Sequence, residues 1–180
     1  MQVCQQILIW EKMGELHVKI SINISAKHFE SLSFVDDIIE IVSSYKVDPK
    51  WIQIEITESQ VQNMENTLSA QHKKLIDFGF TVAIDDFGTG FSSLVLLRKL
   101  YIDTIKVDKY FVDEIVDDSA SRDLLSGILF ITEALKLKVV IEGVENEEQV
   151  KVLKDIGFRV FQGYYFSKPI SAAEVTQFKL

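Results

Sequence analysis

The chain is 180 residues long, a length typical of one domain, and 47% of its residues are hydrophobic, which is enough for a core and excludes a disordered chain. Charged residues make up 26%, and the formal net charge of −8 argues against a general binding surface for DNA, RNA or anionic membranes. The single cysteine, Cys4, excludes a disulfide framework and a zinc site built from cysteines.

Short β-branched and apolar runs alternate with helical patterns along the chain. The sequence opens with a helical pattern, Gln2–Met13, rather than with a strand. The predicted strands are Val18–Ser25, Trp51–Thr57, Thr81–Gly88, Thr104–Asp108, Val139–Glu145 and Arg159–Phe166. Apolar residues at three- and four-residue steps predict amphipathic helices over Phe29–Tyr45, Ser59–Phe78 and Ser119–Leu135. Gly79 and Gly157 are typical of helix ends that precede a strand.

The spacing of these elements predicts the fold class. The strands start about 20–35 residues apart, which leaves room for one strand and one returning helix and so predicts βαβ units around a parallel sheet. About six such units in one domain, residues 1–180, fall short of a closed (β/α)8 barrel, which needs about 250 residues. The fold class is therefore α/β, as either an open doubly wound sheet or an incomplete TIM-like barrel. No glycine-rich phosphate fingerprint follows the first strand, which argues against a dinucleotide-binding fold.

Polar residues recur where the predicted strands end. In a parallel barrel the carboxyl ends of the strands form the active-site rim, because the βα loops open there. The residues at or near these ends are Asn23, Glu55, Asp85, Asp86, Lys106, Asp108, Glu142, Glu145 and Gln162. Converging carboxylates repel one another unless cations neutralise them, and hard oxygen ligands favour Mg²⁺ or Mn²⁺ over zinc. The adjacent Asp85 and Asp86 can serve two ions, and Lys106 can stabilise charge on a phosphate.

Each of these residues alone has a plainer interpretation. An acidic residue at a strand end is most often a turn residue or a helix N-cap, and Glu58 before a helical pattern fits a capping role. The recurrence of acidic residues at successive strand ends favours a functional site over this interpretation.

Several motifs, taken in order, resemble the EAL-domain family. They are SINISAKHF at 21–29, EITES at 55–59, IDDFGTGFSSL at 84–94, IKVDKYFV at 105–112, VVIEGVE at 139–145 and FQGYYFSKP at 161–169. Members of this family are bacterial phosphodiesterases that linearise cyclic di-GMP, and their fold is a modified (β/α)8 barrel. The resemblance therefore implies an incomplete TIM-like barrel, cyclic di-GMP as the partner and metal-dependent hydrolysis to the linear dinucleotide.

The resemblance also implies roles for individual residues. The positions that resemble the ligands of a site for two Mg²⁺ or Mn²⁺ ions are Asn23, Glu55, Asp85, Asp86 and Glu142. Lys106 resembles the family's catalytic lysine, and Glu142 is the second candidate catalytic residue. Glu58 resembles the glutamate that braces the loop Phe87–Ser93, which the family uses at its dimer contact. The positions that resemble supporting residues around the site are Asp108, Glu145 and Gln162.

One departure from the family pattern concerns the Glu-Ala-Leu motif that gives the family its name. In the family this motif lies on an early strand, before the position matched by Asn23, and its glutamate is a metal ligand. The literal triplet of this sequence, at 133–135, falls in a predicted helix and is a coincidence. The chain is therefore expected to lack roughly the first two strands of the barrel.

Two classes of function stay open at this point. The first is a cyclic di-GMP phosphodiesterase whose activity is impaired in this chain, and the second is a non-catalytic cyclic di-GMP receptor or protein-interaction module. Strand edges without neighbours predict self-association, as a homodimer or a larger assembly. No DNA partner is expected, and because no run of 18 apolar residues occurs, this segment is expected to cross no membrane and to lie in the cytoplasm.

Overall fold

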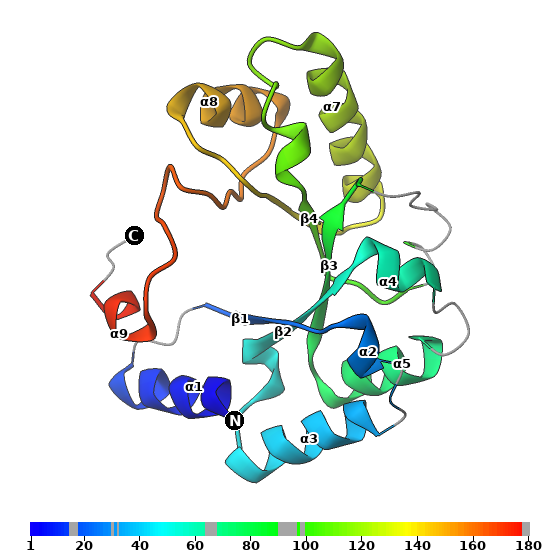
Figure 1. Ribbon diagram of the computed structural model, residues 1–180, viewed down its shortest axis with the longest axis vertical. Helices are drawn as coiled ribbons and strands as arrows, with labels where there is room; N and C mark the ends of the chain where they lie inside the picture. The colour runs from blue at the N-terminus through cyan, green and yellow to red at the C-terminus, as the bar shows by residue number, and fades with distance from the viewer. Residues whose placement is uncertain are drawn as a thin grey trace. The chain divides into compact units, whose positions relative to one another are not determined.

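The strands are short, parallel and rich in β-branched residues. The computed structural model describes residues 1–14, 18–29, 31, 33–63, 68–89, 97 and 100–177 (Figure 1). The strands are β1 Ile20–Asn23, β2 Ile52–Thr57, β3 Thr81–Phe87, β4 Thr104–Val107 and β5 Lys138–Ile141. β1 pairs with β2, and β4 pairs with both β3 and β5, in parallel in every case. The parallel α/β class predicted from the spacing is confirmed.

Helices connect the strands. The α-helices are α1 Gln2–Met13, α2 Ala26–Phe29, α3 Phe34–Tyr45, α4 Glu58–Asn63, α5 Leu68–Phe78, α7 Ser119–Ala134, α8 Glu147–Ile156 and α9 Ala172–Val175, and the 3-10 turns are η1 Pro49–Trp51 and η2 Lys109–Phe111. Gly79 and Gly157 follow α5 and α8 and return their N–H groups to the last helical turn, as predicted. Within the described residues, no helix is long and apolar enough to cross a membrane.

The chain forms two compact units, each with a core of its own. The first unit comprises Met1–Ile56, Met64–Val82 and Pro169–Leu180, and the second comprises Thr57–Asn63 and Ala83–Lys168. In the first unit α1 packs against α3 and α3 packs against α5. In the second, α7 packs against β5 and lies beside α8 (Figure 1). Fully buried side chains of the second core include Ile84, Ile105, Ile115, Leu125, Ile141 and Phe158.

Two predicted helices have different bounds in the structure. The helix predicted over Phe29–Tyr45 begins at Phe34, because residues 26–29 form the separate short helix α2 and Ser33 occupies the N-cap position of α3. The helix predicted over Ser59–Phe78 is replaced by α4 and α5, and residues 64–67 between them lie outside the described residues.

The strand predicted over Arg159–Phe166 is wrong. Phe161 makes an isolated bridge to Ile141, and no strand forms across these residues. Instead the chain bends at Gly163 and wraps around Val144, which donates its N–H to the Gln162 carbonyl at 3.1 Å and accepts the Tyr165 N–H at 3.1 Å. The glycine permits this bend because a Cβ there would lie 2.0 Å from the Val144 carbonyl oxygen.

Replacing Gly163 with alanine is expected to destabilise the second unit. The added methyl group meets backbone atoms of Val144, which cannot rotate away, so the free energy of unfolding should fall by about 3 kcal/mol or more. Gly127→Ala in α7 is the matched control, because nothing lies within 4 Å of a Cβ there. This control should gain up to about 1 kcal/mol from helix propensity. Urea unfolding of both variants measures the difference, and equal stabilities would contradict the close approach at Gly163.

Candidate active site

Asp85 and Asp86 project from an irregularity near the end of β3. The pairing of β3 with β4 shifts register between Ile84 and Phe87. The two aspartates together therefore lie opposite a single residue of β4, Lys106. A β-bulge of this kind re-aims side chains, because the extra residue interrupts the alternation of the strand. Ile84 and Phe87 on either side are buried in the core, whereas Asp85 is partly exposed and Asp86 is exposed, near the carboxyl end of β3.

The backbone of Asp86 is left-handed. Its φ is +53°, a conformation that costs a residue with a side chain about 1 kcal/mol and that aspartate tolerates better than most. The Thr89 hydroxyl supports the turn by donating a hydrogen bond to the Asp86 carbonyl at 2.9 Å. Backbone strain held at a carboxylate in this way is typical of functional sites.

Glu142 completes an acidic cluster with the two aspartates. It follows β5 directly, and its N–H continues the strand ladder by bonding the Val107 carbonyl at 3.0 Å. One carboxylate oxygen from each of Asp85, Asp86 and Glu142 lies within 4.8 Å of the others. The three residues come from β3 and from the end of β5, so the rigid sheet sets their positions. The convergence of these carboxylates predicted from the sequence is present.

Lys106 lies against two members of this cluster. Its Nζ is 2.9 Å from Asp85 Oδ1 and 2.8 Å from Glu142 Oε1, and the residue is only 8% exposed. The sequence predicted this lysine at the rim formed by the strand ends, and in the structure its side chain is buried there. Two charged partners hold its ammonium group in one orientation, which is the arrangement that electrostatic catalysis requires.

The donor chemistry of the cluster fits a divalent metal ion. All three residues offer carboxylate oxygens, and hard oxygen donors suit Mg²⁺ and Mn²⁺ better than softer ions. Three carboxylates near one another also need more positive charge than one lysine supplies. The site therefore suits a divalent cation on charge as well as on ligand type.

The other two predicted ligands lie together in the first unit. Asn23 ends β1 and is the direct register partner of Glu55 on β2. Glu55 is 3% exposed, and its carbonyl accepts the N–H of Ile24 at 2.9 Å. A buried carboxylate on a central strand position is unusual unless it is paired or binds a cation.

Glu58 braces the turn that follows β3. Its side chain is buried at 3% exposure, and its Oε2 accepts the Gly88 N–H at 2.7 Å. Gly88 has a φ of +95°, and a Cβ there would lie 2.4 Å from the ring of Phe111. The resemblance implied that Glu58 braces the loop Phe87–Ser93, and the observed bond joins Glu58 to Gly88 at the start of that loop. The loop Phe87–Ser93 is described only as far as Thr89, and its remainder lies outside the described residues.

Replacing Glu58 with alanine is expected to loosen this turn. The Gly88 N–H loses a charge-assisted hydrogen bond, which costs about 1–3 kcal/mol in the free energy of unfolding. Glu58→Gln keeps an acceptor oxygen and should lose less. Glu114→Ala, an exposed change in the same unit, is the control. If thermal unfolding gives the same stability for Glu58→Ala and Glu114→Ala, the hydrogen bond from Gly88 to Glu58 contributes nothing to stability.

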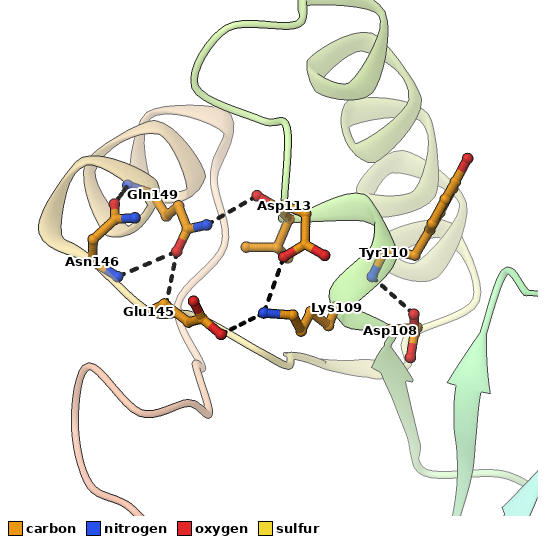
Figure 2. A network of polar contacts seen from close by, with 8 residues as sticks. Asp108, Lys109, Tyr110, Asp113, Glu145, Asn146 and Gln149 are labelled. Atoms are coloured by element: carbon orange, nitrogen blue, oxygen red, sulfur yellow. Dashed lines mark hydrogen bonds and ion pairs between the residues drawn. The ribbon is translucent and has the colours of Figure 1, made fainter.

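The three predicted supporting residues have other contacts. Asp108 and Glu145 closely follow Lys106 and Glu142 in sequence, whereas Gln162 lies well beyond them. Asp108 caps η2, its Oδ1 accepting the Tyr110 N–H at 2.8 Å. Glu145 forms an ion pair with Lys109 (Figure 2). The hydrogen bond to Glu145, and to a lesser extent the one to Asp113, raises the pKa of the Lys109 ammonium. Gln162 is exposed and contributes its backbone to the bend around Val144.

The family model that matches the chain is the one described as the EAL domain, and it matches residues 1–169. The chain belongs to the EAL-domain family. Oxygen sensor protein DosP of Escherichia coli strain K12 is 37% identical over 175 residues, which cover 97% of this chain and 22% of that protein. The chain thus spans about a fifth of the length of this EAL relative.

Solved EAL structures superpose closely on the chain. The PaMucR phosphodiesterase, in a complex with c-di-GMP, has a TM-score of 0.91 at 31% identity, covering 97% of this chain and 70% of that one. Klebsiella pneumoniae BlrP1, in a complex with manganese and cyclic di-GMP, has a TM-score of 0.78 at 32% identity, covering 84% and 39%. These likenesses confirm the TIM-barrel-like α/β fold class and the EAL resemblance read from the motifs.

Proposed function

We propose that this EAL domain is a metal-dependent phosphodiesterase that hydrolyses cyclic di-GMP to the linear dinucleotide. The observation that carries the proposal is the acidic cluster of Asp85, Asp86 and Glu142, with the buried Lys106 bridging two of its members. Family membership supports the substrate, since the similar MucR of Pseudomonas aeruginosa is named a bifunctional diguanylate cyclase and cyclic di-GMP phosphodiesterase.

The proposed metal ligands are five oxygen-bearing side chains. They are Asn23, Glu55, Asp85, Asp86 and Glu142. Two Mg²⁺ or Mn²⁺ ions bound by this set would lower the pKa of water and polarise the scissile phosphate. The manganese complex of BlrP1 supports an ion of this class, and this chain's choice between magnesium and manganese is part of the test below.

Lys106 and Glu142 are the proposed catalytic residues. The ammonium of Lys106 is fixed by Asp85 and Glu142, so it can offset negative charge that develops on the phosphoryl oxygens. The Glu142 side chain is 15% exposed, and its carboxylate is proposed to accept a proton released by the attacking water. Fixing both groups beforehand removes the cost of ordering them in the transition state.

The remaining predicted residues have proposed supporting roles. Glu58 holds the turn after β3, while Asp108 and Glu145 order the loops after β4 and β5. Gln162 is proposed to lie near the substrate: its side chain is exposed, and its carbonyl accepts the N–H of Val144, two residues after Glu142. We also propose that the chain self-associates, as a homodimer or a larger assembly, and acts in the cytoplasm. Sedimentation at several concentrations tests the dimer.

Incubation of the purified chain with cyclic di-GMP tests the proposed activity. Linear dinucleotide should form with Mn²⁺ or Mg²⁺ and should not form with a chelator present, as separated by chromatography. Asp85→Asn is the matched inactive variant, because it keeps the side chain's shape and removes its charge. Tight binding of cyclic di-GMP without any product would favour the non-catalytic receptor instead. The absence of both binding and product would contradict the proposal.

A further inference from the structure

A buried amide joins the two loops that follow β4 and β5. Gln149 of α8 is 5% exposed, and its Nε2 donates to the Val112 carbonyl at 3.2 Å (Figure 2). Its Oε1 accepts the N–H of Glu145 at 2.8 Å and the N–H of Asn146 at 3.2 Å. One side chain therefore holds backbone groups from two segments that lie more than 30 residues apart in sequence.

The same two loops touch at a second place. A Cβ on Gly143, whose φ is +70°, would lie 2.4 Å from the Cβ of Lys109, so the backbone of one loop rests directly against the side chain of the other. The Lys109 ammonium then reaches across to the Glu145 carboxylate and also binds Asp113 at 3.1 Å (Figure 2). A van der Waals contact, an ion pair and a buried amide thus hold these loops together.

The joined loops begin at the candidate active site. Lys109 begins η2, shortly after β4 and Lys106, and Gly143 comes directly after Glu142. Lys106 lies in β4 and Glu142 directly follows β5, so their ion pair at 2.8 Å lies where the two loops begin, whereas Gln149 joins the loops further along the chain. The sheet holds the Glu142 backbone through its bond to Val107, so a separation of the loops at the Gln149 end would act on the Glu142 side chain, which would be freer to turn away from the lysine.

We propose that Gln149 is a positioning residue for the candidate active site. It holds the loop after β5 against the loop after β4, so that Glu142 stays in contact with Lys106. The proposal rests on the function proposed above for this cluster. Within the described residues, the side chain of Gln149 hydrogen-bonds neither the proposed metal ligands nor Lys106. It acts through the backbone of the two loops that it joins.

A helix-capping role is the competing explanation for Gln149. Asn146 and Gln149 form a capping box at the start of α8, with Asn146 Oδ1 accepting the Gln149 N–H at 2.9 Å. A glutamate at this position satisfies a capping box equally well. A carboxylate has no hydrogen to donate, however, so it cannot bond the Val112 carbonyl. Gln149→Glu therefore keeps the cap and removes the connection between the loops.

Competitive lysine labelling of the full chain separates the two roles. In the wild type Lys106 should react slowly with an amine-reactive acylating reagent, because its side chain is 10% exposed and lies between two carboxylates. In Gln149→Glu, labelling of Lys106 should rise severalfold while the exposed Lys138 and Lys154 react as before. Gln149→Met, which buries no charge, should give the same rise and decides the question if the glutamate variant does not fold.

Two further variants are the controls. Asn146→Ala weakens the cap but leaves Gln149 bonded to Val112, and Lys151→Gln makes the same change in charge on the exposed face of α8. Neither should change the labelling of Lys106. A rise in Asn146→Ala equal to that in Gln149→Met, or no rise in either Gln149 variant, would overturn the proposal and leave Gln149 as a capping residue.

Metal binding and turnover extend the test. Manganese affinity and turnover should each fall by about 10- to 100-fold in the Gln149 variants, the usual effect of losing a residue that orients a metal ligand. Unchanged values beside increased Lys106 labelling would overturn the link from the loops to the site. If the wild type hydrolyses no cyclic di-GMP, the proposed function fails, while the labelling result still decides whether Gln149 positions Lys106 and Glu142.

Discussion

Lys106→Ala is expected to lower the turnover of cyclic di-GMP by about 100-fold or more, the scale of losing one electrostatic catalytic group. Manganese affinity should not fall with it, because Asp85 and Glu142 keep their carboxylates and lose a competing cation. Turnover assays and calorimetric titration with Mn²⁺ measure the two quantities on the same protein. If metal binding and turnover fall in parallel, Lys106 acts only by holding the metal ligands in place.

The same substitution should also lower stability in the absence of metal. Lys106 is buried between two carboxylates, and removing one partner of a buried ion pair costs about 3 kcal/mol or more. Added Mn²⁺ should restore part of this loss. Lys138→Ala, an exposed lysine at the start of β5, is the control and should change neither stability nor turnover. Near-normal turnover in Lys106→Ala would mean that the lysine has a structural role only.

Asp85→Asn is expected to weaken manganese binding by about tenfold or more and to abolish measurable turnover. The change removes one negative charge from a hard oxygen site, and ligand charge is a main determinant of divalent-ion affinity. The amide oxygen keeps an acceptor for Lys106, so the fold should persist. Asp123→Asn on the exposed face of α7 controls for net charge. Equal Mn²⁺ affinities in the two variants would contradict the assignment of Asp85 as a ligand.

The position of the acidic cluster could be predicted from sequence because it depends on topology. Carboxyl ends of parallel strands share one edge of a sheet, so Asp85, Lys106 and Glu142 had to lie near one another once their strands were recognised. The helix ends at Gly79 and Gly157 could likewise be predicted from the local sequence, since a glycine readily adopts the positive φ that ends a helix.

Other features could not be predicted because they depend on contacts between distant segments. The bulge at Asp85 and Asp86 requires the register of β3 against β4, which no local pattern specifies. The segment around Gly163 has the composition of a strand, but it pairs with β5 only through the bridge at Phe161, and the close approach of Gly163 to Val144 follows from no local pattern. Gln149 carried a usable signal, because Asn146 three residues before it fits a capping box, but its bond to Val112 did not follow from that pattern.

Diffraction at the manganese absorption edge, from crystals of the chain grown with Mn²⁺ and cyclic di-GMP, tests the central claim most directly. The claim is that Asp85, Asp86 and Glu142 hold a catalytic divalent ion beside Lys106. An anomalous peak should lie among these three carboxylates, with a phosphate of the nucleotide next to the Lys106 ammonium. A nucleotide bound elsewhere, or a cluster without a manganese peak while the nucleotide is bound, would contradict the account.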